Sequence, residues 1–233
     1  MPEPDGSRIP VSCQCGPHPA VTDKVDRHLS SRWQAPVATH NHEAFEQARQ
    51  WRQASGAERP LMLDSGCGTA LSSVQLAESH PHALVIALDQ SRARLTRARN
   101  RFSVPDNLLL LRAECADFWR LARARGWSLE RHYLLYPNPW PKPGHLARRW
   151  HGHPVFPDLL ALGGVLEVRS NWRLYLEEMA LALERAGPGP AHPESFTPAE
   201  PATDFERKYH HSGHSLYRLR CDLDGRGVEA VSR

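Results

Sequence analysis

The sequence contains no long hydrophobic run, few cysteines and little excess of either charge. No stretch of about 18 apolar residues occurs in the 233-residue chain, so no transmembrane helix is predicted. The first ten residues lack the basic and then apolar layout of a signal peptide. The five cysteines are scattered, and without an export signal we expect reduced thiols rather than a disulfide framework. These absences predict a cytoplasmic protein that binds no membrane.

The charge balance and the cysteine spacing bear on two further questions, an RNA partner and a metal site. Twenty-nine Lys and Arg residues face 26 Asp and Glu residues, for a net charge of +3, which permits an RNA partner without requiring one. Cys13-Gln14-Cys15 with His18 is one residue short of the C-x-x-C spacing that zinc sites use, and no second pair follows. We therefore predict no metal site.

Short apolar segments alternate with segments of helical periodicity, which is typical of an α/β fold. A mostly parallel central sheet with helices on both faces is predicted. The first 40 residues are rich in proline, glycine and histidine, so we expect a poorly ordered segment over 1–40 and a single domain over 41–233. The expected strands are 61–63, 83–88, 108–111, 133–136 and 165–168, and the expected helices include 42–53, 71–79, 91–102, 156–162 and 172–185.

A glycine-rich turn and two acidic residues follow successive predicted strands. Asp64-Ser65-Gly66-Cys67-Gly68-Thr69-Ala70 lacks the third glycine of dinucleotide-binding loops and the Lys of phosphate-binding loops. Asp89 ends the second strand, where it could hold both hydroxyls of a ribose. Glu114 follows the third strand and could accept from an adenine amino group. A cofactor with adenosine and few phosphates fits, namely S-adenosylmethionine. The candidate cofactor-binding residues are Asp64, Gly66, Gly68, Asp89, Glu114, Cys115 and Asn138.

Four ordered motifs between residues 61 and 219 carry a family resemblance. The D-S-G-C-G-T-A turn is similar to the glycine loop of class I S-adenosylmethionine-dependent methyltransferases. Residues 137–149 match P-x-P-W-x-K-x-x-H-x-x-R-R, which resembles the signature of the TrmB-type tRNA (guanine(46)-N(7))-methyltransferases. Gly163-Gly164 precedes a strand that ends in Ser170-Asn171, with Tyr175 following, and residues 203–206 resemble the family's T-x-[FY]-E motif.

The resemblance implies a Rossmann-like methyltransferase that modifies guanine N7 in the variable loop of tRNA. It implies a tRNA partner and no DNA, and leaves monomer and homodimer open. Asn138, between two prolines that fix the direction of the chain, would be the catalytic residue that orients the base. The residues implied to hold RNA or the target nucleotide are Lys142, His145, Arg148, Arg149, Asn171, Thr203 and Glu206.

Two positions depart from the family pattern at the reacting end. The family has Asp where this chain has Asn138 and Asn171, and an amide can accept a hydrogen bond but carries no negative charge. Two alternatives therefore stay open. Asn138-Pro139 also resembles the N-P-P-[YF] loop of methyltransferases that act on amino or amide nitrogens. The chain could also be a non-catalytic paralogue that binds tRNA or the cofactor.

Overall fold

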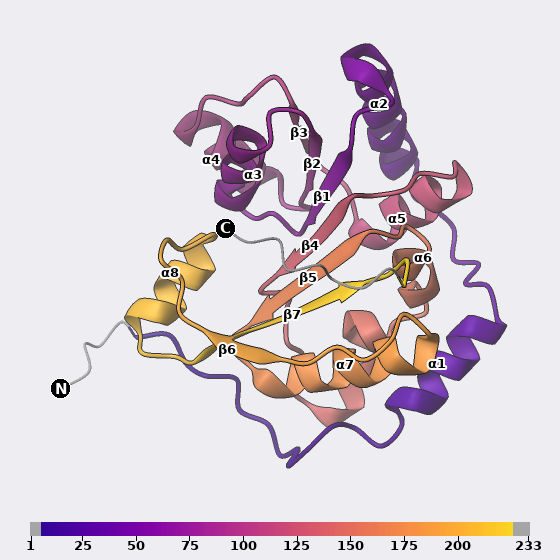
Figure 1. Cartoon of the computed structure of the whole chain (residues 1–233), viewed down its shortest axis with the longest axis vertical. Helices are drawn as coiled ribbons and strands as arrows, with labels where there is room; N and C mark the ends of the chain where they lie inside the picture. The colour runs from indigo at the N-terminus through magenta and orange to yellow at the C-terminus, as the bar shows by residue number, and fades with distance from the viewer. Residues whose placement is uncertain (1–5, 226–233) are drawn as a thin grey trace.

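The computed structural model describes residues 6–225 and contains a seven-stranded sheet in the order β3-β2-β1-β4-β5-β7-β6 (Figure 1). Strands β1 to β5 run parallel to one another, and β7 runs antiparallel to both β5 and β6. The prediction of a mostly parallel sheet is confirmed. The strands are β1 Leu61–Ser65, β2 Leu84–Leu88, β3 Leu108–Leu111, β4 Arg131–Leu135, β5 Val165–Ser170, β6 Glu194–Phe196 and β7 Leu216–Asp222.

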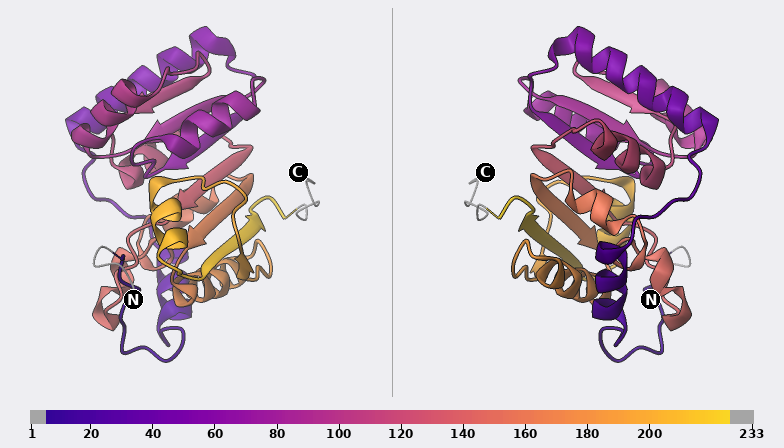
Figure 2. Two further views of the ribbon diagram at one scale, coloured as in Figure 1. Left: turned by 90° about the vertical axis from the view of Figure 1, so that its left-hand side faces the viewer. Right: turned by 90° about the vertical axis from the view of Figure 1, so that its right-hand side faces the viewer.

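Side chains of the central strands alternate between two apolar layers, because successive residues of a strand point to opposite faces. Met62 and Val85 belong to a cluster with the helices α3 (Leu71–Ser79) and α4 (Arg92–Arg101). Leu63 and Ile86 belong to the larger cluster on the other face. Both faces of the sheet are therefore covered by helices (Figure 2).

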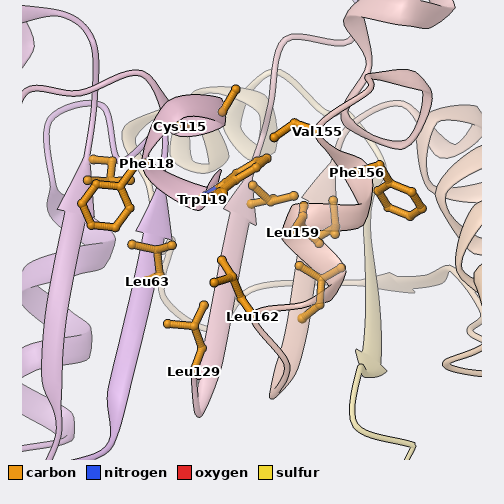
Figure 3. Packing of buried hydrophobic residues seen from close by; sticks show 14 of the residues in the cluster. Leu63, Cys115, Phe118, Trp119, Leu129, Val155, Phe156, Leu159 and Leu162 are labelled. Atoms are coloured by element: carbon orange, nitrogen blue, oxygen red, sulfur yellow. The ribbon is translucent and has the colours of Figure 1, made fainter. Parts of the chain in front are cut away.

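The larger cluster is formed by α2 (Thr39–Gly56), α5 (Cys115–Ala124), α6 (Phe156–Leu160) and α7 (Arg173–Ala186). Figure 3 shows Trp119 of α5 lying between the sheet and the segment around Val155. Its indole N–H donates to Ser65 Oγ over 3.0 Å, which satisfies a buried polar group at the end of β1.

The predicted elements match the structure most closely at β3 and α3, which have the predicted bounds. Helix α4 begins after Ser91, whose side chain caps it by accepting from the Arg94 N–H. Sequence reasoning did not assign β6 or α8 (Asp204–His211). Among residues 6–225, no helix has both the length and the apolar character needed to cross a bilayer.

The N-terminal segment differs from the prediction of poor order over 1–40. Residues 21–30 form α1 (Val21–Ser30), which packs against α7 with Val21 and Val25 almost completely buried. The two valines lie four residues apart and so share one face of the helix. Helix α1 was not predicted because the surrounding sequence is rich in proline and glycine and the helix has only this short apolar pair. Residues 1–5 of the predicted segment lie outside the described residues.

A buried ion pair joins this N-terminal segment to the rest of the fold. Glu178 of α7 accepts from Arg149, which lies between the 3-10 helices η1 (Pro143–Arg148) and η2 (Trp150–Gly152), and neither side chain is exposed. The same carboxylate accepts from His151 Nε2 at 2.9 Å, Gln14 Nε2 at 3.0 Å and the His18 N–H at 2.9 Å. Burial opposes its ionisation, but the hydrogen bonds from His151 and Arg149 outweigh burial and lower the pKa of Glu178 to about 2.

Glu178→Gln is expected to lower the free energy of unfolding by about 3–5 kcal/mol, because Arg149 would keep a buried and uncompensated charge. Since the pKa of Glu178 lies below its ordinary value of 4.5, its contribution is complete above pH 4.5 and is lost as the pH falls toward 2. Urea unfolding at several pH values would measure both effects. Glu177→Gln, which breaks only a surface pair with Arg173, should change stability by less than about 1 kcal/mol. Equal losses in the two variants would contradict this role.

Candidate active site

A cleft of about 740 Å³ lies where the carboxyl ends of β1, β2 and β4 meet. One half is bordered by the glycine turn after β1 and by the residues that follow β2 and β3. The other half is bordered by the loop after β4 and by α8. Of the predicted site residues, the cleft is lined by Gly66, Asp89, Glu114, Cys115, Asn138, Arg148 and Asn171.

The glycine turn follows a path that side chains disfavour. Gly66 (φ 81°) and Gly68 (φ 60°) both lie in the left-handed region. A Cβ added to Gly66 would meet no atom within 4 Å, so this glycine leaves open space in the cleft. Ala70, the N-cap residue of α3, also has a left-handed backbone (φ 59°).

Asp64 lies beneath this turn and does not line the cleft. Its carboxylate is 1% exposed and accepts from the hydroxyls of Ser72 at 2.6 Å and Ser73 at 2.7 Å, which fastens β1 to the start of α3. Burial raises its pKa. The candidate cofactor-binding residue Asp64 thus shapes the glycine turn from within the protein, because the two serines of α3 hold its carboxylate.

Asp89 has the predicted place at the mouth of β2. Its Oδ1 accepts from the Ser91 N–H at 2.7 Å, and its Oδ2 accepts from the Gly68 N–H at 3.0 Å and from Arg94 at 3.4 Å. A carboxylate offers about four acceptor positions, so one remains for a ligand. Gly68 does not line the cleft; its N–H donates to Asp89 and so fixes the carboxylate in place. Glu114 borders the same half, and burial raises the pKa of its carboxyl group.

The loop after β4 presents Asn138 at the cleft in a strained conformation. Tyr136 (φ 54°) and Trp140 (φ 46°) are left-handed, which costs about 1–2 kcal/mol for a residue with a side chain. The Oδ1 atom of Asn138 accepts from the Trp140 N–H at 3.3 Å. Strain of this kind is concentrated at functional sites, where the surrounding structure maintains it.

Aromatic side chains of α8 form a wall that sequence reasoning missed. Phe205 and Tyr209 line the cleft, and Tyr209 stacks on Phe205 and on His214 with ring centroids 6.0 and 5.3 Å apart. The spacing of Phe205 and Tyr209, four residues apart, could have indicated a shared helix face. Helix α8 is held over the cleft because Asp204 accepts from the Thr69 hydroxyl of the glycine turn at 2.5 Å.

The predicted RNA-binding cluster divides into exposed and buried members. Arg148 is exposed, and its guanidinium lies 4.8 Å from the ring centroid of Trp140, which also lines the cleft. Lys142 is exposed on the same loop, and His145 is half-buried with its ring edge toward Trp140. Arg149 does not face solvent, because it is committed to Glu178. Its predicted contact with RNA is therefore not available in this structure.

Glu206 and Thr203 also have internal partners. The carboxylate of Glu206 is fully buried and accepts two hydrogen bonds of 3.1 Å from Arg169. Thr203 caps α8 by accepting from the Glu206 N–H at 2.9 Å. Both residues thus fix the aromatic helix, which differs from the predicted direct contact with the nucleotide. Tyr175 is likewise buried, and its hydroxyl accepts from the Trp150 N–H.

The buried cysteines are expected to react slowly with iodoacetamide at about pH 8, because the thiolate is the nucleophile. Burial raises the pKa of Cys67 and of Cys115, although Cys115 lines the cleft. Cys13 and Cys15 are exposed and should be alkylated first. Peptide mass spectrometry over time would give the order. Early alkylation of Cys115 would contradict its burial and would make it a candidate nucleophile.

Sequence comparisons relate the chain to methyltransferases. A sequence model of a methyltransferase family matches residues 58–219. The tRNA (guanine-N(7)-)-methyltransferase of Halorhodospira halophila is 32% identical over 185 residues, which cover 73% of this chain and 79% of that protein. The enzyme of the same name from Leifsonia xyli is 29% identical over 180 residues, 70% of this chain and 76% of that protein.

Solved structures with a similar fold include two 16S rRNA methyltransferases. The 16S rRNA methyltransferase KamB is 22% identical with a TM-score of 0.55, covering 76% of this chain and 92% of that one. A variant of the 16S rRNA (adenine(1408)-N(1))-methyltransferase of Catenulisporales acidiphilia, solved with its cosubstrate, is 20% identical with a TM-score of 0.53. That match covers 79% of this chain and 93% of that one. These likenesses establish the Rossmann-like fold.

Proposed function

Because this chain belongs to the family of tRNA (guanine-N(7)-)-methyltransferases, we propose that it methylates N7 of a guanine in the variable loop of tRNA. The observation that carries the proposal is a single cleft bordered by Asp89 and the glycine turn in one half and by Asn138 in the other. A methyl donor and an acceptor base could thus occupy one space. We further infer that the protein works in the cytoplasm, where tRNA and reduced thiols are found.

The residues in the glycine-turn half fit S-adenosylmethionine. This cofactor, when bound, supplies an electrophilic methyl group on a sulfonium centre. Gly66 leaves room for close approach, Asp89 has an acceptor position free for ribose hydroxyls, and Glu114 is placed for the adenine amino group. Cys115 lines the same half of the cleft and is uncharged, which suits an apolar contact with the adenine ring. Asp64 supports the turn from below.

The acceptor half has to position a base rather than deprotonate it. Guanine N7 carries a lone pair and no proton, so transfer needs alignment more than a strong base. Phe205, Tyr209 and Trp140 offer aromatic faces on which a base can stack. Asn138 lines the same cleft as these rings. The alternative with an amino-nitrogen substrate needs the Asn138 carbonyl as acceptor; this oxygen accepts from the Trp140 N–H and has one lone pair left.

Arg148 and Lys142 extend the acceptor half onto the surface and provide positive charge for the RNA backbone. Arg148 can hold a phosphate while its guanidinium stays over the Trp140 ring, because a cation–π contact leaves the N–H groups free. The arginines of α4 lie beside the cofactor half, and Arg94 reaches the cleft itself. The RNA would thus cross the mouth of the cleft.

The proposed reaction is tested with labelled S-adenosylmethionine and tRNA that lacks the modification. We expect transfer of the labelled methyl group to tRNA. Chemical cleavage of the labelled tRNA should then occur at 7-methylguanine. Label at another nitrogen would favour an amino-group substrate. Binding of both ligands without transfer would favour a non-catalytic paralogue.

Asp89→Ala is expected to weaken S-adenosylmethionine binding by about 1–3 kcal/mol, the cost of losing hydrogen bonds to a charged acceptor. Calorimetric titration would measure the affinity. Asp106→Ala, which removes an equal charge from an exposed position outside the cleft, is the matched control and should leave the affinity unchanged. Equal affinities of the Asp89 variant and the wild type would remove Asp89 from the cofactor site.

Arg148→Ala is expected to reduce the salt dependence of tRNA binding by roughly one unit of slope, because one phosphate contact is lost. Binding measured at several salt concentrations gives the slope. Arg173→Ala removes the same charge from an exposed position on α7 and should keep the wild-type slope. An unchanged slope for the Arg148 variant would assign this residue to packing on Trp140 alone.

A further inference from the structure

The Cys13-Gln14-Cys15 motif has no part in the proposed reaction, yet both of its thiols are exposed on one side of the chain. Exposure alternates along residues 11–19, so the two cysteines are exposed and Gln14 between them is half-buried. Side chains two residues apart in such an alternating segment share a side. The Sγ atom of Cys15 lies 4.0 Å from the carbonyl oxygen of Cys13. The two thiols are therefore close neighbours that solvent can reach.

Gln14 fastens this motif to the buried ion pair. Its Oε1 accepts from Arg149 Nη2 over 2.7 Å, and its Nε2 donates to Glu178 over 3.0 Å. Arg149 in turn donates to the carbonyl oxygens of Trp140 and Lys142. One amide side chain thus connects the exposed cysteine motif to the loop after β4.

A disulfide between the two cysteines would pull on this amide. Residues at positions i and i+2 have Cα atoms at most about 7 Å apart, which is within the reach of a disulfide. The bond also requires Cβ atoms about 3.8 Å apart, so the backbone at Gln14 has to bend. Ser12 is held by its own hydrogen bond to the Pro141 carbonyl oxygen at 2.6 Å, so Gln14 rather than the whole segment has to move. Ring closure and docking of Gln14 therefore oppose each other.

We propose that Cys13 and Cys15 form a reversible disulfide, a modification site through which a small-molecule disulfide such as glutathione disulfide controls the loop that carries Asn138. One cysteine thiolate attacks the small disulfide and releases one small thiol. The other cysteine then attacks this mixed disulfide, forms the bond between Cys13 and Cys15 and releases the second small thiol. The protein loses two electrons and two protons, and the small disulfide gains both.

Docking and oxidation are linked, because each shifts the equilibrium of the other by the same factor. Docked Gln14 stabilises the dithiol form and makes the disulfide easier to reduce than it would be in an undocked segment. Strained or exposed disulfides of this kind are the labile and regulatory ones. In a reducing compartment the protein is therefore docked and its acceptor half is firm, whereas oxidation withdraws Gln14 from Arg149 and loosens the loop after β4.

The first test equilibrates the protein with mixtures of reduced and oxidised glutathione and maps the thiols by peptide mass spectrometry. In the wild type, the peptide that contains both cysteines should lose two hydrogen atoms and resist alkylation. Cys15→Ser can form only a mixed disulfide at Cys13, which separates ring closure from simple addition of glutathione. Wild-type protein that shows only free thiols or mixed disulfides at these positions would refute the site.

The second test measures the reduction potential of the disulfide in Gln14→Ala. Without docking, the disulfide should become about tenfold harder to reduce, which is ~30 mV more negative for a two-electron couple. Gln47→Ala makes the same change at an exposed position on α2 and should keep the wild-type potential. A wild-type potential in the Gln14 variant would show that docking and oxidation are independent, against the proposal.

The third test compares tRNA binding by the reduced and the oxidised protein, and it rests on the proposed function. Oxidation should weaken tRNA binding severalfold and leave the affinity for S-adenosylhomocysteine unchanged. The double variant Cys13→Ser, Cys15→Ser should bind tRNA equally under both conditions, which controls for the buried Cys67, Cys115 and Cys221.

The outcomes separate this inference from the proposed function. Equal tRNA affinity of the reduced and the oxidised wild type would refute control of the loop by the disulfide. A protein that binds tRNA in neither state would refute the proposed function, and the reduction potentials would still decide whether docking and oxidation are linked.

Discussion

The buried carboxylate of Glu178 is the contact on which the arrangement of the acceptor half depends. It gathers donors from the N-terminal segment, from η2 and from Arg149, which itself donates to the carbonyl oxygens of Trp140 and Lys142. Two segments far apart in the sequence, 14–18 and 149–151, are therefore held against α7 by one charge. A buried ion pair of this kind contributes more to fixing one arrangement of the segments than to net stability. The loop that carries Asn138 is held in place by these hydrogen bonds.

The two halves of the cleft are joined across its mouth by a second polar contact. Asp204 accepts from Thr69 in the glycine turn and from Arg101 at the end of α4, so α8 is fixed to the elements that border the cofactor half. The aromatic wall of Phe205 and Tyr209 is thereby set at a defined place relative to Asp89. The geometry of the acceptor half thus depends on a residue of the glycine turn.

Much of the fold could be predicted from local signals, because β1, β2 and β3 are built on short apolar runs and Ser91 caps α4. The places of Gly66, Asp89 and Asn138 followed from the strand ends. The roles of Arg149 and Glu206 could not be predicted. An arginine in a basic cluster resembles a phosphate ligand, and only tertiary contacts with Glu178 show that it is buried. The aromatic wall was missed because α8 has only eight residues and follows a proline-rich linker, which hides the four-residue spacing of Phe205 and Tyr209.

Three residues with side chains have left-handed backbones within residues 6–225, and all three belong to the two loops that border the cleft. Ala70, Tyr136 and Trp140 each cost about 1–2 kcal/mol relative to a relaxed backbone. Glycine would relieve that cost but would also loosen the loops in the unfolded and the folded chain. The strained torsions of these three residues therefore lower the free energy of unfolding by several kcal/mol. In return, the two loops that border the cleft keep a fixed geometry.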